Sequence, residues 1–149
     1  MLRNLDPLLT PELLYVLAAM GHGDEIVVCD ANFPAESVAQ RTVHGSVVRL
    51  PGADAPAAAR AILSLLPLDE FVDTAAFRME VVGDPDELPE VQQQVQALVD
   101  EAAGRSWPLG SLERFAFYEA AKNAYAVVAT GERRFYGCFV FKKGVIPPE

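Results

Sequence analysis

The chain has 149 residues, and its 12 basic and 21 acidic side chains give a formal net charge of −9 at pH 7. With 51% hydrophobic and only 22% charged residues it can bury a sizeable core, which excludes disordered, collagen-like and coiled-coil classes. A pI near 4.6 and the absence of any run of Lys and Arg argue against binding to nucleic acid or to an anionic membrane surface. A neutral or cationic small molecule fits better as a ligand.

Two cysteines, Cys29 and Cys138, lie far apart in the sequence, each within an apolar stretch. This pattern is typical of buried small hydrophobic residues rather than of a disulfide framework or a zinc site, and it favours a reducing compartment. Asp6, Pro7 and Pro11 interrupt the apolar N-terminus, so no signal peptide is predicted. No apolar run reaches the roughly 18 to 20 residues that span a bilayer, and we expect a soluble, cytoplasmic protein.

The first half of the chain alternates between helix and strand patterns. Thr10-Pro11-Glu12 supplies an N-cap and a proline at the first helical position, and the apolar stripe that follows predicts a helix that stops at Gly21. Further on, short apolar runs predict strands, and an alanine-rich stretch closed by Pro67 predicts a helix. These elements are strands over Glu25–Asp30 and Val43–Leu50 and a helix over Ala57–Leu66.

The second half continues the same alternation, and Gly104 closes its longest predicted helix. The predicted elements are a strand over Phe77–Val82, helices over Pro89–Ala103 and Phe115–Ala124, and strands over Ala126–Ala129 and Cys138–Phe141. No repeat and no long linker divides the chain. We therefore expect residues 1–149 to form a single α/β domain with a central mixed sheet flanked by helices.

Common catalytic motifs are absent. Gly21 and Gly23 form a Gly-x-Gly, but it precedes a predicted strand instead of following one, so the dinucleotide-binding context fails. The chain has no Walker loop, no Gly-x-Ser-x-Gly elbow, no His-Glu-x-x-His and no paired Cys-x-x-Cys. Asp84, Asp86 and Glu87 lack calcium-loop spacing and are typical of an ordinary helix N-terminus. Nucleotide, serine-hydrolase and metal chemistry therefore have no support in the sequence.

His22 and Asp30 are the first candidates for chemistry. His22 lies between two glycines beyond a predicted helix, where it is either a helix-end residue favoured by the dipole or a proton donor and acceptor near neutral pH. Asp30 ends a predicted strand, where it either forms a turn or cap or faces a ligand at the carboxyl edge of the sheet. The short spacing between the two residues predicts that both side chains line one pocket.

Three further features stay open on the residues alone. His44 lies at a predicted strand start with no evident partner. Arg114 is either a surface residue at a helix start or a donor fork for ligand hydroxyls. The segment 130–137 is rich in hydrogen-bonding groups, as many solvated loops are.

Several segments, taken together, closely resemble the L-fucose mutarotase branch of the RbsD/FucU family in order and spacing. The resemblance is dense at residues 11–34 and 114–145, whereas the middle follows the family more in element pattern than in residues. The segments are Pro11-Glu12-Leu13-Leu14, Met20–Ile26, Asp30–Pro34, Arg114–Glu119, Thr130–Arg133 and Lys142–Val145.

The resemblance implies an RbsD-like fold and an isomerase that interconverts the α and β anomers of L-fucose or a related free monosaccharide, without cofactor or metal. It implies that His22 is the catalytic histidine. The residues that it implies for sugar binding are Asp30, Arg114, Tyr118, Tyr136, Gly137 and Cys138. Cys138 departs from the family's Tyr-Gly-Asn segment, and a thiol is a poor hydrogen-bond partner beside a carboxamide. Either the backbone makes that contact or the preferred sugar differs.

The implied chemistry agrees with these residue types. Opening a pyranose hemiacetal needs a proton delivered to the ring oxygen while another leaves the anomeric hydroxyl, and an imidazole serves as donor and then acceptor near neutral pH. The resemblance also implies a homo-oligomeric ring, commonly a decamer, with active sites between neighbouring subunits. The alternatives are a non-catalytic sugar-binding or regulatory protein, and a pyranase for ribose-like sugars, which Arg114 disfavours because that branch usually has histidine.

Overall fold

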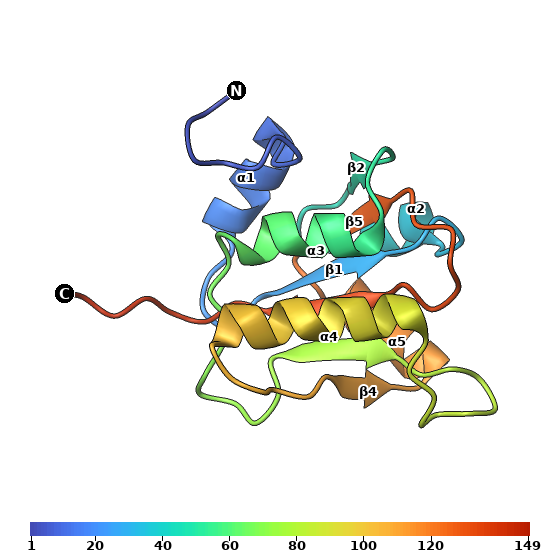
Figure 1. Cartoon of the computed structure of the whole chain (residues 1–149). Helices are drawn as coiled ribbons and strands as arrows, with labels where there is room; N and C mark the ends of the chain where they lie inside the picture. The colour runs from blue at the N-terminus through green and yellow to red at the C-terminus, as the bar shows by residue number, and fades with distance from the viewer.

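Short apolar runs form the strands of a six-stranded mixed sheet with the order β2-β5-β1-β6-β3-β4. The computed structural model describes residues 1–149, and Figure 1 shows the sheet with its helices. The strands are β1 (Glu25–Cys29), β2 (Val47–Leu50), β3 (Ala76–Met79), β4 (Gly110–Leu112), β5 (Ala126–Thr130) and β6 (Phe139–Lys142). The helices are α1 (Pro11–Ala19), α2 (Ala35–Ala39), α3 (Ala55–Leu63), α4 (Glu90–Ala103) and α5 (Arg114–Lys122).

The direction of the strands gives the sheet two chemically different edges. β6 runs antiparallel to both of its neighbours, β1 and β3, while the other strand pairs are parallel. The carboxyl ends of five strands and the start of β6 therefore meet at one edge, which we call the carboxyl edge. The opposite edge, called the amino edge, holds the starts of those five strands and the end of β6.

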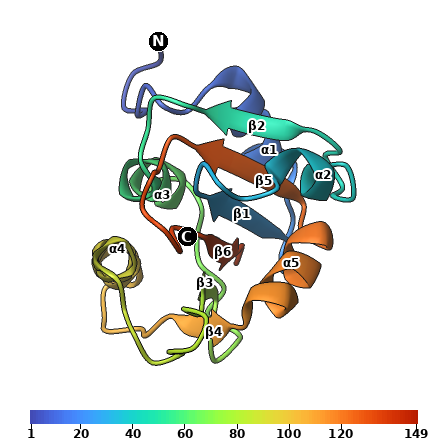
Figure 2. The same ribbon diagram turned by 90° about the vertical axis from the view of Figure 1, so that its right-hand side faces the viewer.

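Residues that alternate along β1 face opposite helix layers, as the strand period of two requires. Ile26 and Val28 belong to the larger apolar cluster, which also contains buried residues of α1, α3 and α4. Val27 and Cys29 belong to a second cluster with buried residues of α2 and α5. Figure 2 shows α3 and α4 on one side of the sheet and α2 and α5 on the other. The predicted α/β class, with helices flanking a central mixed sheet, is confirmed.

Local capping signals set the ends of the helices. The Thr10 hydroxyl accepts a hydrogen bond from the Leu13 N–H at 3.2 Å, and Asp54 caps α3 by accepting from the Ala57 N–H at 2.8 Å. Gly104 ends α4 with a φ of +70°, a conformation that glycine adopts without strain. None of the helices combines the length and the apolar character that crossing a membrane requires.

The structure corrects several predicted boundaries. The predicted strand Val43–Leu50 begins only at Val47, because the chain turns before it and Gly45 has a φ of +80°. The predicted strand Phe77–Val82 ends at Met79, since Val81 and Asp84 form a small antiparallel bridge around a turn. The five-residue α2 and the three-residue β4 were not predicted, because such short elements show no periodicity.

Candidate functional site

A cavity of about 230 Å³ opens at the carboxyl edge. It is formed where segments distant in the sequence converge: Asp30 follows β1, Met79 ends β3, Arg114 begins α5 and Cys138 precedes β6. Strand ends of the same direction meet at this edge, which is where α/β proteins commonly bind ligands. Five of the residues predicted to bind sugar line the cavity, and they are Asp30, Arg114, Tyr118, Tyr136 and Cys138.

Asp30 is the buried acceptor of this cavity. Its side chain turns the chain after β1 by accepting hydrogen bonds from the Asn32 and Phe33 N–H groups, both at 3.0 Å. Burial raises the pKa of Asp30 above its usual range and outweighs the hydrogen bonds from Asn32, Cys138, Phe33 and Gly137, which lower it. A poorly hydrated carboxylate of this kind is a strong acceptor for a ligand hydroxyl.

Arg114 is the cationic donor at the cavity. It is the first residue of α5, where a positive charge opposes the helix dipole, so helix stability does not account for it. Its Nε donates to the Tyr118 hydroxyl at 3.0 Å, and this bond raises the pKa of the guanidinium. The terminal NH2 groups make no hydrogen bond within the chain. The Tyr118 contact orients the fork while leaving those donors available.

Tyr136 adopts a left-handed backbone conformation, with a φ of +62°. Such a conformation costs a non-glycine residue about 1 to 3 kcal/mol and persists when the surroundings enforce it. Here the Gln92 amide donates to the Tyr136 carbonyl at 3.1 Å, and the Val82 N–H donates to the Tyr136 hydroxyl at 3.2 Å. The hydroxyl keeps its own hydrogen for a ligand.

Gly137 and Cys138 bring the start of β6 against Asp30. A Cβ at Gly137 would lie 2.8 Å from Glu132 Cγ and 3.5 Å from Asp30 Cβ, so a side chain there would collide. Cys138 is 2% exposed, and its thiol lowers the pKa of Asp30. Burial, and then the Asp30 charge, raise the pKa of Cys138 well above its usual range. Cys138 is therefore a neutral thiol beside the carboxylate.

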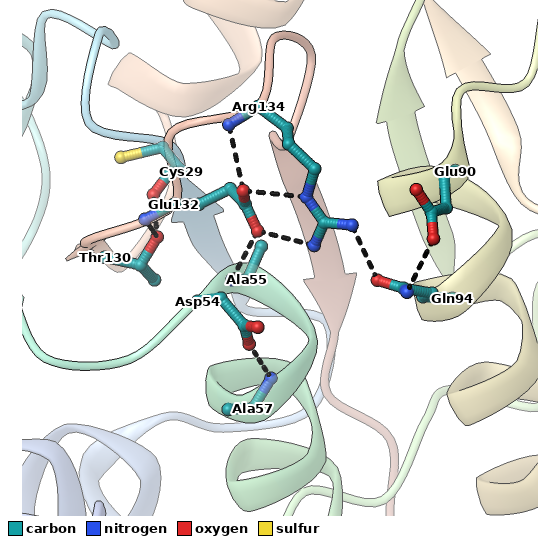
Figure 3. Close-up of polar contacts among 9 residues, drawn as sticks. All are labelled: Cys29, Asp54, Ala55, Ala57, Glu90, Gln94, Thr130, Glu132 and Arg134. Atoms are coloured by element: carbon teal, nitrogen blue, oxygen red, sulfur yellow. Dashed lines mark hydrogen bonds and ion pairs between the residues drawn. The ribbon is translucent and has the colours of Figure 1, made fainter.

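An ion pair fixes the loop that carries Tyr136. The two Glu132 carboxylate oxygens accept from Arg134 Nε and Nη2, each at 2.9 Å, and Glu132 Oε2 accepts from the Ala55 N–H at 3.2 Å (Figure 3). The Arg134 hydrogen bond is the main reason that the pKa of Glu132 falls to about 2. Arg134 Nη1 also donates to Gln94 at 3.0 Å. The loop is thereby tied to the start of α3 and to α4. No pattern in the sequence indicated this pairing beyond the density of polar groups.

His22 lies at the amino edge and does not line the cavity. His22 precedes β1, and Asp30 follows β1. At roughly 3.3 Å per residue, the five residues of β1 alone span about 16 Å between the two positions. The prediction that both side chains line one pocket within a chain is therefore wrong. Short spacing in the sequence was misleading because residues on either side of a strand emerge at opposite edges of the sheet.

The partner of His22 is Asp69, which sequence reasoning missed. His22 Nε2 lies 3.1 Å from Asp69 Oδ1, and the His22 side chain is half exposed while Asp69 is buried. Burial acts to raise the pKa of Asp69, but hydrogen bonds from the Phe71 N–H and from His22 outweigh it and hold the pKa below its usual range. The Phe71 ring centroid lies 5.6 Å from that of His22. His22 and Asp69 are 47 positions apart in the sequence, so no local pattern reveals their contact.

Two other features complete the description of polar sites. His44, for which the sequence showed no evident partner, pairs with Glu12: its Nε2 lies 3.0 Å from Glu12 Oε1. A larger hollow of about 540 Å³ shares Asp30 with the smaller cavity, and its lining includes Glu36 and Arg49, an exposed ion pair. Apart from Asp30, none of the predicted sugar-binding residues lines that hollow. No group of three or more His, Cys, Asp or Glu side chains is arranged to hold a metal ion.

The fold and the smaller cavity define an α/β protein with a pocket lined by a carboxylate, a guanidinium and aromatic side chains at the carboxyl edge of a mixed sheet. Residues 3–146 match the RbsD / FucU transport protein family. The chain belongs to this family, and the predicted resemblance is confirmed.

Similar proteins match along almost the whole chain. The fucose mutarotase of Danio rerio is 48% identical, over 99% of this chain and 96% of its own length. The L-fucose mutarotase of Actinobacillus pleuropneumoniae serotype 5b (strain L20) is 41% identical over 99% of each chain. Among solved structures, the fucose mutarotase of Streptococcus pneumoniae in complex with L-fucose has a TM-score of 0.88 and 37% identity, covering 98% of this chain and all of its own.

Proposed function

We propose that this protein is an isomerase that interconverts the α and β anomers of L-fucose or a closely related free monosaccharide. One observation carries the proposal: Asp30, Arg114, Tyr118, Tyr136 and Cys138, which the family resemblance assigns to sugar binding, come from three separate segments and line one cavity. Relatives that match the whole length of the chain carry the name fucose mutarotase, which supports the same reaction.

The cavity has the chemistry that a neutral sugar needs. The Asp30 carboxylate accepts hydrogen bonds from sugar hydroxyls, and the free NH2 groups of Arg114 donate to them. Phe33, Met79 and Val82 supply apolar walls for the C–H faces of the ring. A neutral substrate meets no electrostatic barrier from the net charge of −9.

The proton donor and acceptor is His22, and it is supplied by a second copy of the chain. Because His22 and Asp30 lie at opposite edges of one subunit, a complete site requires the amino edge of one copy to meet the carboxyl edge of the next. Such a head-to-tail contact uses two different surfaces and closes into a ring when the rotation permits. We propose a homo-oligomeric ring, and the family resemblance indicates a decamer.

Exposed apolar side chains at both edges support this contact. At the amino edge, Phe71 beside His22 is 77% exposed; at the carboxyl edge, Val82 and Phe135 beside the cavity are 63% and 73% exposed. Large apolar side chains gathered around a polar site are typical of a surface that another protein covers. Burial of Phe71 against the rim of the cavity would also bring the imidazole to the sugar.

Ring opening follows from these placements. The imidazolium of His22 delivers a proton to the ring oxygen as the anomeric hydroxyl passes its proton to water, which opens the ring to the aldehyde. The aldehyde rotates, and on reclosure the former ring oxygen returns its proton to the imidazole while water returns a proton to the anomeric oxygen. No covalent intermediate and no cofactor are required. Asp30 and Arg114 hold the hydroxyls meanwhile, so that the opened chain stays in place.

Saturation-transfer proton NMR on anomeric signals tests the proposal directly. Added protein should transfer saturation between the α and β signals of L-fucose faster than buffer alone does. D-ribose, galactose and other free sugars form the comparison panel. Faster exchange with none of them would contradict the proposal, while thermal stabilisation by a sugar without exchange would point to the sugar-binding alternative.

We also propose that the protein works in the cytoplasm. The β1–β6 register pairs Val28 with Phe139, and its continuation by one residue sets Cys29 opposite Cys138. Both cysteines are free despite this proximity. A reducing compartment keeps such neighbouring thiols from forming a disulfide bond. Thiol titration of protein isolated under anaerobic conditions should count two free cysteines per chain, and a count of none would contradict this assignment.

A further inference from the structure

The segment after α3 places a buried carboxylate against the half-exposed imidazole at the amino edge. Asp69 Oδ1 lies 3.1 Å from His22 Nε2 and also accepts the Phe71 N–H at 3.0 Å. The Asp69 N–H donates to the Lys142 carbonyl at 3.1 Å, which fixes the carboxylate to the end of β6. Nothing in the helix or sheet pattern requires an aspartate here, so its orientation calls for a role.

We propose that Asp69 is the positioning residue for His22: it holds a hydrogen on Nε2 and thereby makes Nδ1 the nitrogen that exchanges protons with the sugar. This inference rests on the proposed function, since it specifies how the same histidine acts.

The nature of the acceptor fixes the tautomer. An ionised carboxylate has no hydrogen to donate, so the ring nitrogen that faces Asp69 must be the donor. In the neutral imidazole the other nitrogen, Nδ1, then carries the lone pair. Nδ1 makes no hydrogen bond within the chain, which leaves it free for a ligand. The lowered pKa of Asp69 agrees with an ionised partner at neutral pH.

The charge of Asp69 also stabilises the imidazolium that forms during ring closure. The other charged groups nearby do not replace it. Asp24 caps Gly21 through its Oδ2 at 2.7 Å, and the Lys143 ammonium donates to the Leu17 carbonyl at 2.8 Å and to that of Met20. Lys142 acts on Asp69 and lowers its pKa. Asp69 is therefore the carboxylate in direct contact with the imidazole.

Asp69→Asn in the assembled protein is the first test. The amide keeps an oxygen for the Phe71 N–H but removes the negative charge beside His22. We expect kcat for L-fucose anomer exchange to fall about 10²-fold or more with little change in KM, because the sugar is held at the other edge. The midpoint of the pH–rate profile should move to lower pH, since the imidazolium has lost its carboxylate.

Asp73→Asn is the matched control. Asp73 is exposed on the same segment and contributes its backbone carbonyl, not its carboxylate, to Trp107 Nε1. This variant also removes one negative charge but should leave the rate and the pH profile unchanged. A purely structural role of Asp69 would lower the melting temperature without moving the pH midpoint, and that result would overturn the inference.

A second measurement does not depend on any variant of Asp69. Nitrogen-15 spectra of histidine-labelled protein report which ring nitrogen carries hydrogen, and His44→Gln leaves a single ring to observe. We expect the Nε2–H tautomer for His22, and finding the Nδ1–H tautomer would overturn the inference even if Asp69→Asn failed to fold. Wild-type protein that exchanges no sugar would instead refute the proposed function, with the tautomer still deciding the role of Asp69.

Discussion

The thiol of Cys138 and the carboxylate of Asp30 act on each other at the carboxyl edge of the sheet, where the thiol lowers the pKa of Asp30 and the Asp30 charge raises the pKa of Cys138. The thiol is buried and neutral, and it presents a weakly polar sulfur to the cavity. Cys138, which stands where the family has asparagine, therefore keeps a weak hydrogen-bond donor near Asp30 but lacks the acceptor oxygen of the amide.

Cys138→Asn should consequently leave kcat/KM for L-fucose unchanged or raise it, because a carboxamide also donates to Asp30 and adds an acceptor. Initial rates of anomer exchange, measured beside the melting temperature, check this. A large loss of L-fucose turnover in a variant that still folds would mean that the cavity recognises a different sugar. Cys29→Ser, which alters the opposite thiol outside the cavity lining, is the control.

The separation of His22 from Asp30 predicts complementation between inactive subunits. His22→Ala should lower exchange about 10²- to 10⁴-fold while leaving folding and assembly intact, because the ring contributes little to the core. Asp30→Asn should be inactive through loss of sugar binding. When the two variants are coassembled in equal amounts, about one quarter of sites that are shared between subunits would receive both native residues.

Exchange activity of the mixed rings checks this prediction. Recovery of about a quarter of the wild-type rate is expected for shared sites. Mixed rings with no more activity than either variant alone would show that each site is built within one chain, and would leave His22 without access to the sugar. Mass spectrometry of the intact assembly confirms that the subunits have mixed.

The pKa of Asp30 predicts how sugar binding depends on pH. The ionised carboxylate accepts the sugar hydroxyls, and burial raises its pKa, so affinity should be complete at neutral pH and decline as pH falls through that raised value. The decline should begin at a higher pH than for an exposed aspartate. Stabilisation of the protein by L-fucose, measured between pH 4 and 7, follows this change. Affinity that stays constant over the range would contradict the assignment of Asp30.

The pair between Glu132 and Arg134 predicts acid sensitivity of the fold. The pKa of Glu132 is depressed to about 2 from a reference value of 4.5, so its stabilisation is complete above that reference and is lost as pH falls toward 2. Glu132→Gln should lower the free energy of unfolding at pH 7 by about 2 to 3 kcal/mol, less than for a fully buried pair because Arg134 is partly exposed.

Urea denaturation at pH 7 and pH 3 measures this effect, and the difference between wild type and Glu132→Gln should shrink at the lower pH. Arg133→Gln, which changes an exposed neighbour with no side-chain hydrogen bond, should have little effect at either pH. A destabilisation that is equal at both pH values would mean that packing, not charge, holds the loop.

Chelation tests the expectation that the reaction needs no metal. Proton transfer by an imidazole requires no Lewis acid, so treatment with EDTA followed by dialysis should leave the rate of anomer exchange unchanged. Loss of activity that added divalent cations restore would contradict the proposed chemistry.

The sequence by itself determined the α/β class, most of the element positions and membership of the family. Thr10-Pro11, Gly104 and the apolar runs act through short-range capping, backbone and periodicity effects, which local residue patterns express directly. It also singled out Asp30, Arg114, Tyr136 and their neighbours, because strand ends and family motifs are visible in one dimension.

Tertiary structure alone decided how these residues are grouped. The edge of the sheet at which a strand ends depends on the order and direction of the strands. Strand direction placed His22 at the edge opposite to Asp30, and the antiparallel β6 brought Cys138 to the same edge as Asp30. The pairing of His22 with Asp69 spans 47 positions and arises from the way the end of β6 holds both segments. Contacts of this range depend on the packing of the whole sheet, so no local pattern of residues encodes them.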